Sequence, residues 1–134
     1  MKLPDDVRAF LDAPRFAVLA TVRADGSPHL TVVWYGRRED EVIVNTTAPR
    51  SKAKNIERDP RVSLLVGEME RYVRLEGDAR IVATGETALR DIRDLGVRYD
   101  GEAAAERQTR AVWSTQARVT YAIATRRLYR YGFG

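Results

Sequence analysis

Two short apolar runs joined by a tight turn signal constrain the fold of this chain more than any other feature of its sequence. The runs cover residues 16–22 and 30–35 and are rich in β-branched and aromatic side chains, a composition typical of strands. Between them stands Asp25-Gly26, whose glycine supplies the positive φ angle that a hairpin turn requires. The two runs are therefore predicted to pair as antiparallel strands.

Three later segments continue the β pattern. Residues 42–44 and 61–66 are short apolar runs followed by polar or turn-forming residues, and residues 72–82 alternate between apolar and charged side chains. Such alternation is expected for a strand with one buried face. The residues predicted on that face are Val73, Leu75, Gly77, Ala79 and Ile81.

The end of the chain and one polar stretch complete the β prediction. Residues 119–133 alternate again and predict a last strand, in which Tyr129 and Tyr131 face inward. Residues 36–41 are polar and are predicted as a connection without a strand.

Helical spacing occurs in four separate segments. Residues 4–13, 50–58, 86–95 and 102–115 place their apolar side chains three and four positions apart, and Gly96 is expected near the end of the third helix. These helices do not alternate with single strands, as they do in parallel α/β folds. The chain is therefore predicted to be mainly β (α+β), an antiparallel barrel with short peripheral helices, and to form one domain over residues 1–134.

Composition excludes several classes of function. The 134 residues contain no cysteine, which excludes disulfides, thiolate nucleophiles and cysteine-bound zinc. No apolar run approaches the roughly 20 residues of a membrane helix, and no secretion signal is recognisable, so a cytoplasmic protein without membrane contact is expected. The net charge of +4 comes from 23 basic and 19 acidic residues that are interspersed, without a long basic run. A nucleic-acid partner is therefore not expected.

The most informative local feature is a group of polar and basic residues around the predicted start of the second helix. Thr46 and Thr47 bring hydroxyl groups, and Arg50, Ser51 and Lys52 bring further donors and positive charge, at a helix end whose free N–H groups favour an anion. This pattern is typical of a phosphate site. The alternative is that a threonine caps the helix and the basic residues form a solvated face.

The segment around these residues resembles the pyridoxamine 5'-phosphate oxidase-like superfamily of flavin and deazaflavin oxidoreductases. The resemblance extends over residues 16–35, 42–66 and 71–80, and covers about residues 10–83 in all. It implies a six- to seven-stranded antiparallel split β-barrel of the FMN-binding type. The family's extra basic and histidine residues for a pyridoxal phosphate substrate have no match near the C-terminus, so oxidation of vitamin B6 is not expected.

The resemblance also implies a cofactor site and an assembly. The flavin or deazaflavin ring is expected against Val32, Val33 and Trp34, at the interface of a homodimer. The branch that uses coenzyme F420 is favoured, and FMN is the alternative. The residues that the resemblance assigns to the cofactor phosphate are Thr46, Thr47, Arg50, Ser51 and Lys52.

The function that follows is hydride transfer between the reduced deazaflavin and a small organic acceptor, chemistry that belongs to the cofactor. An FMN-dependent oxidoreductase and a non-catalytic flavin, deazaflavin or haem binding protein are the alternatives. The catalytic residues are left unassigned, because no side chain need act as acid or base and a tyrosine or an ordered water could complete protonation. No metal site is predicted, because the single histidine, His29, has no evident partner. A basic path for the oligoglutamate tail of F420 is expected along Arg50, Lys54, Arg58 and Arg61.

Overall fold

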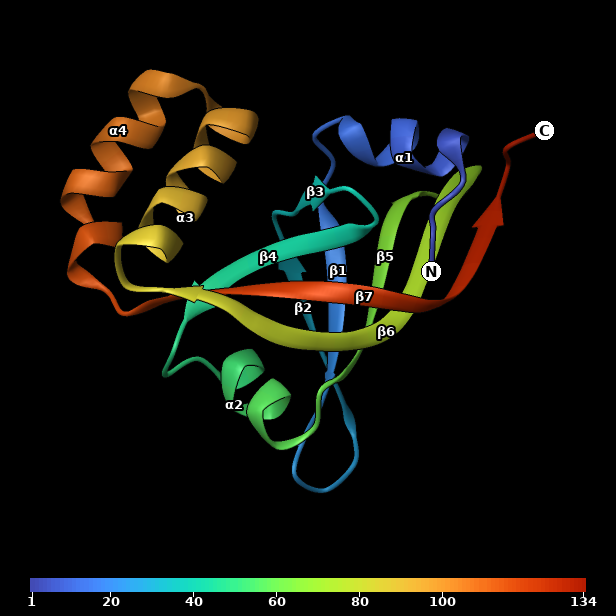
Figure 1. Ribbon diagram of the computed structural model, residues 1–134, viewed down its shortest axis with the longest axis horizontal. Coiled ribbons are helices and arrows are strands. Elements are labelled where there is room, and N and C mark those ends of the chain that lie inside the picture. Colours follow the sequence, from blue (N-terminus) through green and yellow to red (C-terminus); the bar gives the residue numbers. More distant parts are fainter.

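A computed structural model describes residues 1–134, and its strands form a single antiparallel sheet flanked by helices (Figure 1). The strand order is β2-β1-β5-β6-β7-β4-β3. The elements are α1 (Asp5–Asp12), β1 (Ala17–Val22), β2 (Pro28–Val33), β3 (Gly36–Arg38), β4 (Glu41–Thr47), α2 (Ser51–Arg58), β5 (Arg61–Glu68), β6 (Arg71–Thr84), α3 (Gly85–Asp100), α4 (Glu102–Ala111), the 3-10 turn η1 (Trp113–Thr115) and β7 (Arg118–Tyr131).

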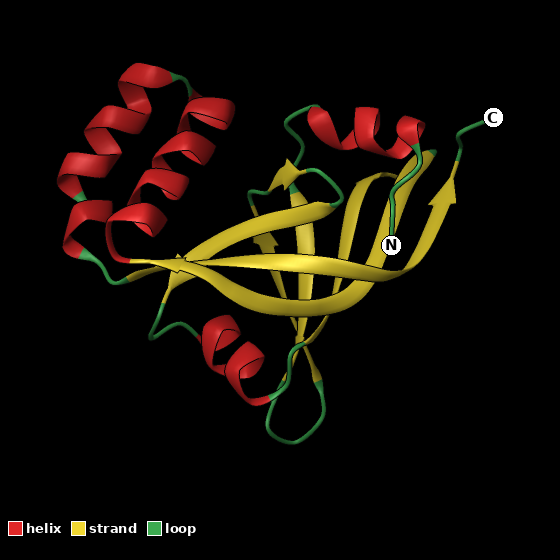
Figure 2. Cartoon of the chain, viewed as in Figure 1, coloured by secondary structure: helices red, strands yellow, loops and turns green.

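The sheet curls into a barrel that stays open. Its two edge strands, β2 and β3, do not pair with each other, so the seven strands form a split barrel, as predicted. Figure 2 shows the helices at the periphery, with α3 and α4 paired beyond one end of the sheet and α2 lying beside the β1–β2 hairpin. None of the α-helices has both the length and the apolar character that a membrane crossing demands.

The predicted β1–β2 hairpin is confirmed. The strands pair from Ala17 with Val33 to Val22 with Pro28, and Gly26 in the turn has a φ of 86°. Alternate residues of β1, beginning at Ala17, are buried in the main hydrophobic core, which also receives apolar side chains from α1, α2 and the other long strands. Helix α2, whose Ala53 and Ile56 join the same core, lies against the inward face of β1.

Besides small shifts at the ends of other elements, two predictions are wrong. Gly36–Arg38 forms the short edge strand β3, which pairs with β4, instead of a plain connection. The prediction missed this strand because these three residues show no alternation of apolar and polar side chains. Gly96 lies inside α3, which continues to Asp100, and does not end it. A Cβ at Gly96 would lie 2.7 Å from the ring of Trp113, so this glycine provides room for the packing of η1 against α3.

A β-bulge reverses the two faces of β7 and overturns the prediction for its tyrosines. Glu76 pairs with Arg127 but Gly77 pairs with Thr125, which leaves Arg126 without a partner. An extra residue in one strand moves every later side chain to the opposite face. Tyr129 and Tyr131 consequently face outward and are 43% and 52% exposed.

The glycine opposite the bulge makes the close backbone approach possible, since a Cβ at Gly77 would lie 1.9 Å from the carbonyl oxygen of Ala124. The alternation in β6 is otherwise as predicted, except that Ile81 is exposed. Ile81 lies beyond the core, at the rim of an open cavity between β6, β7 and α2.

Candidate functional site

The predicted phosphate residues gather where β4 ends and α2 begins. Thr46 and Thr47 are buried at the end of β4, and Ser51 and Lys52 form the first turn of α2. The residue at the helix N-cap is Arg50, and no side chain caps this end. Neither threonine is therefore a helix cap, and the N–H groups of the first turn remain available to a ligand.

A buried arginine from another part of the chain joins this group. Arg118, the first residue of β7, pairs with Thr47 of β4 and is only 9% exposed. Burial, and then the charge of Arg50, lower the pKa of Arg118 to about 10. Burial also lowers the pKa of Lys52, with the charges of Arg50 and Arg118 as further causes.

Arg50, Lys52 and Arg118 are thus three mutually repelling cations, which we call the cationic cluster. None of them has a carboxylate within the 4.0 Å of an ion pair. Arg118 is buried and Lys52 half-buried, whereas Arg50 is exposed at the rim. Charges withdrawn from water without a counter-ion are unfavourable, so an anion placed beside Lys52 and Arg118 would gain both attraction and charge-assisted hydrogen bonds. The cluster fits the phosphate of a flavin or deazaflavin.

Sequence reasoning missed Arg118. In the sequence it is one of many arginines near the C-terminus, and no spacing links it to Lys52. Only the antiparallel pairing of β4 with β7 brings it to the site. Arg118 could have been found only if the pairing of the last strand with the strand that ends at Thr46 and Thr47 had been predicted.

The three residues predicted to contact the ring point in different directions. Val32 faces outward and is 70% exposed, whereas Val33 faces the core. Trp34, just after β2, stacks on Tyr99 of α3 with 5.1 Å between ring centroids and meets Trp113 edge-on at 6.2 Å. A flat ring therefore cannot contact all three side chains from one side, and their assignment to the cofactor remains a prediction.

The inward face of β2 carries two polar atoms without partners. His29 Nδ1 and Thr31 Oγ1 are buried and make no hydrogen bond. His29 pairs with Thr21 of β1, whose hydroxyl accepts a hydrogen bond of 3.0 Å from Asn55 of α2, so this face is directed towards the helix that carries Lys52. Buried polar atoms normally have partners. The carbonyl and ring-nitrogen groups of a flavin-type ring are chemically suited to satisfy them.

The outer face of the sheet has an apolar and a basic half. In the apolar half a hollow of about 530 Å³ lies over β1, β2, β5 and β6. The large apolar side chains exposed on this half include Leu30, Val32, Leu65, Met69 and Tyr131. A contiguous apolar surface of this kind is typical of an interaction site.

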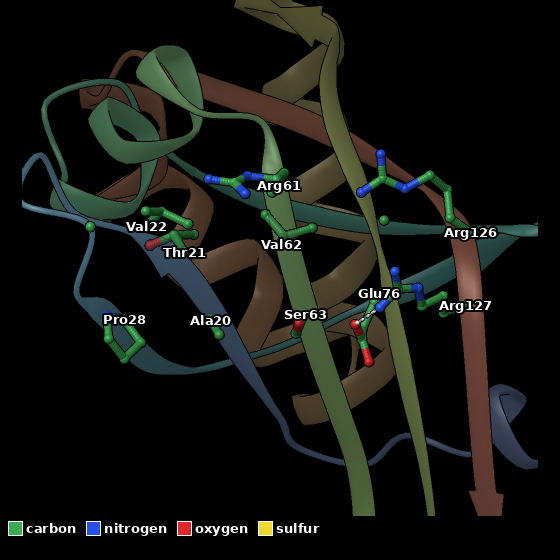
Figure 3. A pocket seen from close by; sticks show the side chains of 12 residues that line it. Ala20, Thr21, Val22, Pro28, Arg61, Val62, Ser63, Glu76, Arg126 and Arg127 are labelled. Atoms are coloured by element: carbon green, nitrogen blue, oxygen red, sulfur yellow. Dashed lines mark ion pairs between the residues drawn. The ribbon is translucent and has the colours of Figure 1, made fainter.

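The basic half is a groove of about 720 Å³ lined by Arg61, Arg126 and Arg127 (Figure 3). Arg126 and Arg127 both reach it because the bulge turns consecutive residues of β7 to one side. Each of the three arginines has a carboxylate partner: Asp59 at 2.7 Å, Asp78 at 2.8 Å and Glu76 at 3.8 Å, respectively. The groove therefore differs from the cationic cluster, where no carboxylate partner is present.

Comparisons with known proteins agree with the fold. The family described as pyridoxamine 5'-phosphate oxidase matches residues 3–125. The F420H(2)-dependent biliverdin reductase of Mycobacterium tuberculosis (strain CDC 1551 / Oshkosh) is 34% identical over 100 residues, which are 73% of this chain and 70% of that protein. A crystal structure of a conserved hypothetical protein from Mycobacterium tuberculosis superposes with a TM-score of 0.81 at 32% identity, covering 98% of this chain and 85% of the other.

A further relative is longer than this chain. The pyridoxine/pyridoxamine 5'-phosphate oxidase of Rubrobacter xylanophilus is 43% identical over 76 residues, but the match covers 54% of this chain and only 35% of that enzyme. The chain thus spans about a third of that oxidase's length, and the likeness is confined to the shared part.

Proposed function

Because the chain belongs to the pyridoxamine 5'-phosphate oxidase family, we propose that it is an oxidoreductase that binds coenzyme F420, with FMN as the alternative cofactor, and reduces a small organic acceptor. The observation that carries the proposal is the cationic cluster, which lacks any protein counter-ion. The choice of F420 over FMN is supported by the similarity to the mycobacterial F420H(2)-dependent biliverdin reductase, whose match covers most of this chain.

The chain's own residues then have defined tasks. Arg50, Lys52 and Arg118 bind the cofactor phosphate, and the Ser51 hydroxyl donates a further hydrogen bond. The reduced deazaflavin, when bound, supplies the hydride. The protein orients ring and acceptor and excludes water, and no side chain is assigned as acid or base. Oxidation of vitamin B6 is not proposed, because the only histidine is His29 on β2.

The protein acts as a homodimer in this proposal. The exposed apolar half of the outer face would be covered by the same surface of a second copy, which is how twofold dimers form. Leu65→Asp, on that half, is expected to yield a monomer in sedimentation at micromolar concentration. Ile81→Asp changes an apolar residue that is at least as exposed as Leu65 but lies away from that half, and leaves the dimer intact. A wild-type monomer that binds cofactor tightly would contradict the proposal.

The test of the function starts from whatever small molecule copurifies, identified by its absorbance spectrum and mass. The protein freed of ligand is then titrated with F420 and with FMN, and each reduced complex is mixed with candidate acceptors. Tight F420 binding with turnover is the expected result. If FMN binds more tightly than F420, FMN is the cofactor. If a cofactor binds but no acceptor is reduced, the protein is a carrier or sensor and not an enzyme. If neither cofactor binds, the proposal is overturned.

A further inference from the structure

Arg118 owes its orientation to two uncharged amide side chains. Its Nε donates to Asn45 Oδ1 at 2.9 Å, and one terminal nitrogen donates to Gln116 Oε1 at 2.7 Å. Neither acceptor carries a charge, so the guanidinium is held in place without being neutralised. Its remaining N–H donors and its full charge stay available for an anion.

The amide of Asn45 can present its oxygen to Arg118 only while its nitrogen is occupied elsewhere. Asn45 Nδ2 donates one hydrogen to the carbonyl oxygen of Ala88 at 2.9 Å and the other to Thr120 Oγ1, also at 2.9 Å. Both donors are used, which leaves Oδ1 facing the arginine. A flipped amide would set its N–H groups against those of Arg118.

The direction of these hydrogen bonds is set by Thr120 and Asp91, which lie further from the site than Asn45. Thr120 is fully buried, and its hydroxyl donates its single hydrogen to Asp91 Oδ2 at 2.7 Å. That hydroxyl must therefore accept from Asn45. The other carboxylate oxygen of Asp91, itself 7% exposed on α3, accepts from Arg38 at 2.6 Å. A carboxylate is an acceptor only, so Asp91 fixes the direction of every hydrogen bond up to Arg118.

We propose that Asn45, Thr120 and Asp91 are positioning residues that aim Arg118 at the cofactor phosphate without touching the cofactor. The inference rests on the proposed function, in that the anion is taken to be the phosphate of F420 or FMN. A buried polar chain of this kind is unfavourable unless each member is satisfied, and the chain here is continuous from Arg38 to Arg118.

The main test substitutes Thr120 in two ways. Thr120→Val keeps the shape but removes the hydroxyl, whereas Thr120→Ser keeps the hydroxyl. We expect Thr120→Val to weaken FMN or F420 about tenfold, a fraction of what a charge-assisted hydrogen bond contributes, and to leave binding of the phosphate-free riboflavin or deazariboflavin unchanged. Thr120→Ser retains wild-type affinity. In an Arg118→Ala background the two Thr120 variants bind FMN or F420 equally, because the residue they act through is gone.

Asp91→Asn provides a second variant. In this variant the new amide oxygen would face Arg38 and the new N–H₂ group would donate to Thr120. The Thr120 hydroxyl would then donate to Asn45 instead of accepting from it, and the Asn45 amide would flip. The same selective loss of FMN or F420 affinity is expected. Equal weakening of phosphate-bearing and phosphate-free ligands, or a Thr120→Val effect that persists without Arg118, would overturn the inference.

A readout without cofactor separates this inference from the proposed function. Titration of inorganic phosphate is followed on the ¹⁵N-labelled Nε–H resonance of Arg118. A phosphate-dependent shift in wild type and Thr120→Ser that is lost in Thr120→Val supports the positioning role even if neither F420 nor FMN binds. Identical shifts in all three proteins would reject the positioning role even if a cofactor binds and turns over.

Discussion

The arginines of this protein fall into two groups that differ in their partners. Ten of the twenty arginines lie within 4.0 Å of a carboxylate, as in Arg37–Asp12, Arg80–Glu41, Arg93–Glu106, Arg126–Asp78 and Arg130–Asp6, and the other ten, Arg50 and Arg118 among them, do not. In the cationic cluster at the start of α2, no carboxylate is present. Among the arginines without a carboxylate, Arg118 is the buried one, so burial together with missing pairing identifies the site better than the net charge of +4 does.

The two groups also differ in what they contribute to the folded protein. An exposed ion pair is already satisfied and contributes little, because water and salt screen it. The cluster opposes folding, since burial and mutual repulsion lower the pKa of both Lys52 and Arg118. A bound anion neutralises the repulsion between these cations. The free energy that destabilises the ligand-free protein therefore favours binding of a negatively charged ligand over a neutral one.

The largest effect is expected from removing a member of the cluster. Arg118→Ala and Lys52→Ala each delete charge-assisted hydrogen bonds to the phosphate and should weaken F420 or FMN by roughly 10- to 100-fold. Lys54→Ala is the matched control, because this exposed lysine lies two residues further along α2 and therefore points about 200° away around the helix, so its loss should weaken binding less than twofold. Calorimetric titration gives the ratios. Equal losses at Lys52 and Lys54 would show that the cluster is not the phosphate site.

A smaller effect is expected on the stability of the cofactor-free protein. Lys52→Met keeps the apolar stem and removes the buried charge, and should raise the melting temperature by a few degrees at neutral pH. The pKa of Lys52 in the folded state lies below its ordinary value of 10.5, so the unfolded chain binds more protons and wild-type stability rises as pH passes through the folded pKa. The difference in melting temperature between Lys52→Met and wild type should therefore become smaller as the pH approaches 10.5.

Adding phosphate at neutral pH provides the control for that experiment. Wild type should gain more thermal stability from phosphate than Lys52→Met does, because the anion relieves the repulsion that the variant already lacks. A Lys52→Met protein that melts lower than wild type without phosphate would mean that the lysine is satisfied by the protein itself.

Features coded by neighbouring residues could be predicted from the sequence. The hairpin at Gly26 and the helix that follows Arg50 depend on turn chemistry and short-range spacing, and both are present. The same holds for the position of Lys52 in the first turn of that helix. These parts of the fold and the site are decided within about ten residues of chain.

Features that depend on contacts between distant segments could not be predicted. Arg118 reaches the site only through the pairing of β7 with β4. The outward direction of Tyr129 follows from the bulge at Arg126, which depends on the missing Cβ of Gly77 against Ala124. The alternation of side chains along a single strand gives no sign of such a reversal, because no particular residue type marks the extra residue of a bulge.

A further prediction concerns the oligoglutamate tail of F420 and the basic path expected for it. Arg58 donates to the carbonyl of Val22, and Arg61 is bound by Asp59, so only Arg50 and Lys54 of that path are free of protein acceptors. Each free charge should add at most about 1 kcal/mol to tail binding, and salt should abolish most of it. Calorimetry with F420 and its tail-less fragment tests this; a tail without effect at low salt would favour FMN.

The smallest effect is expected in the groove of Figure 3, where the charges are already paired. Arg126→Ala removes an exposed ion pair with Asp78 and should lower the free energy of unfolding by no more than about 1 kcal/mol, as measured by urea denaturation. Its affinity for F420 or FMN should equal that of wild type, because the charge it carries is satisfied without a ligand. If Arg126→Ala lowered the affinity for the cofactor as much as Arg118→Ala does, the presence of a carboxylate partner would not distinguish the two groups of arginines. The cofactor site would then have to include the outer face of the sheet.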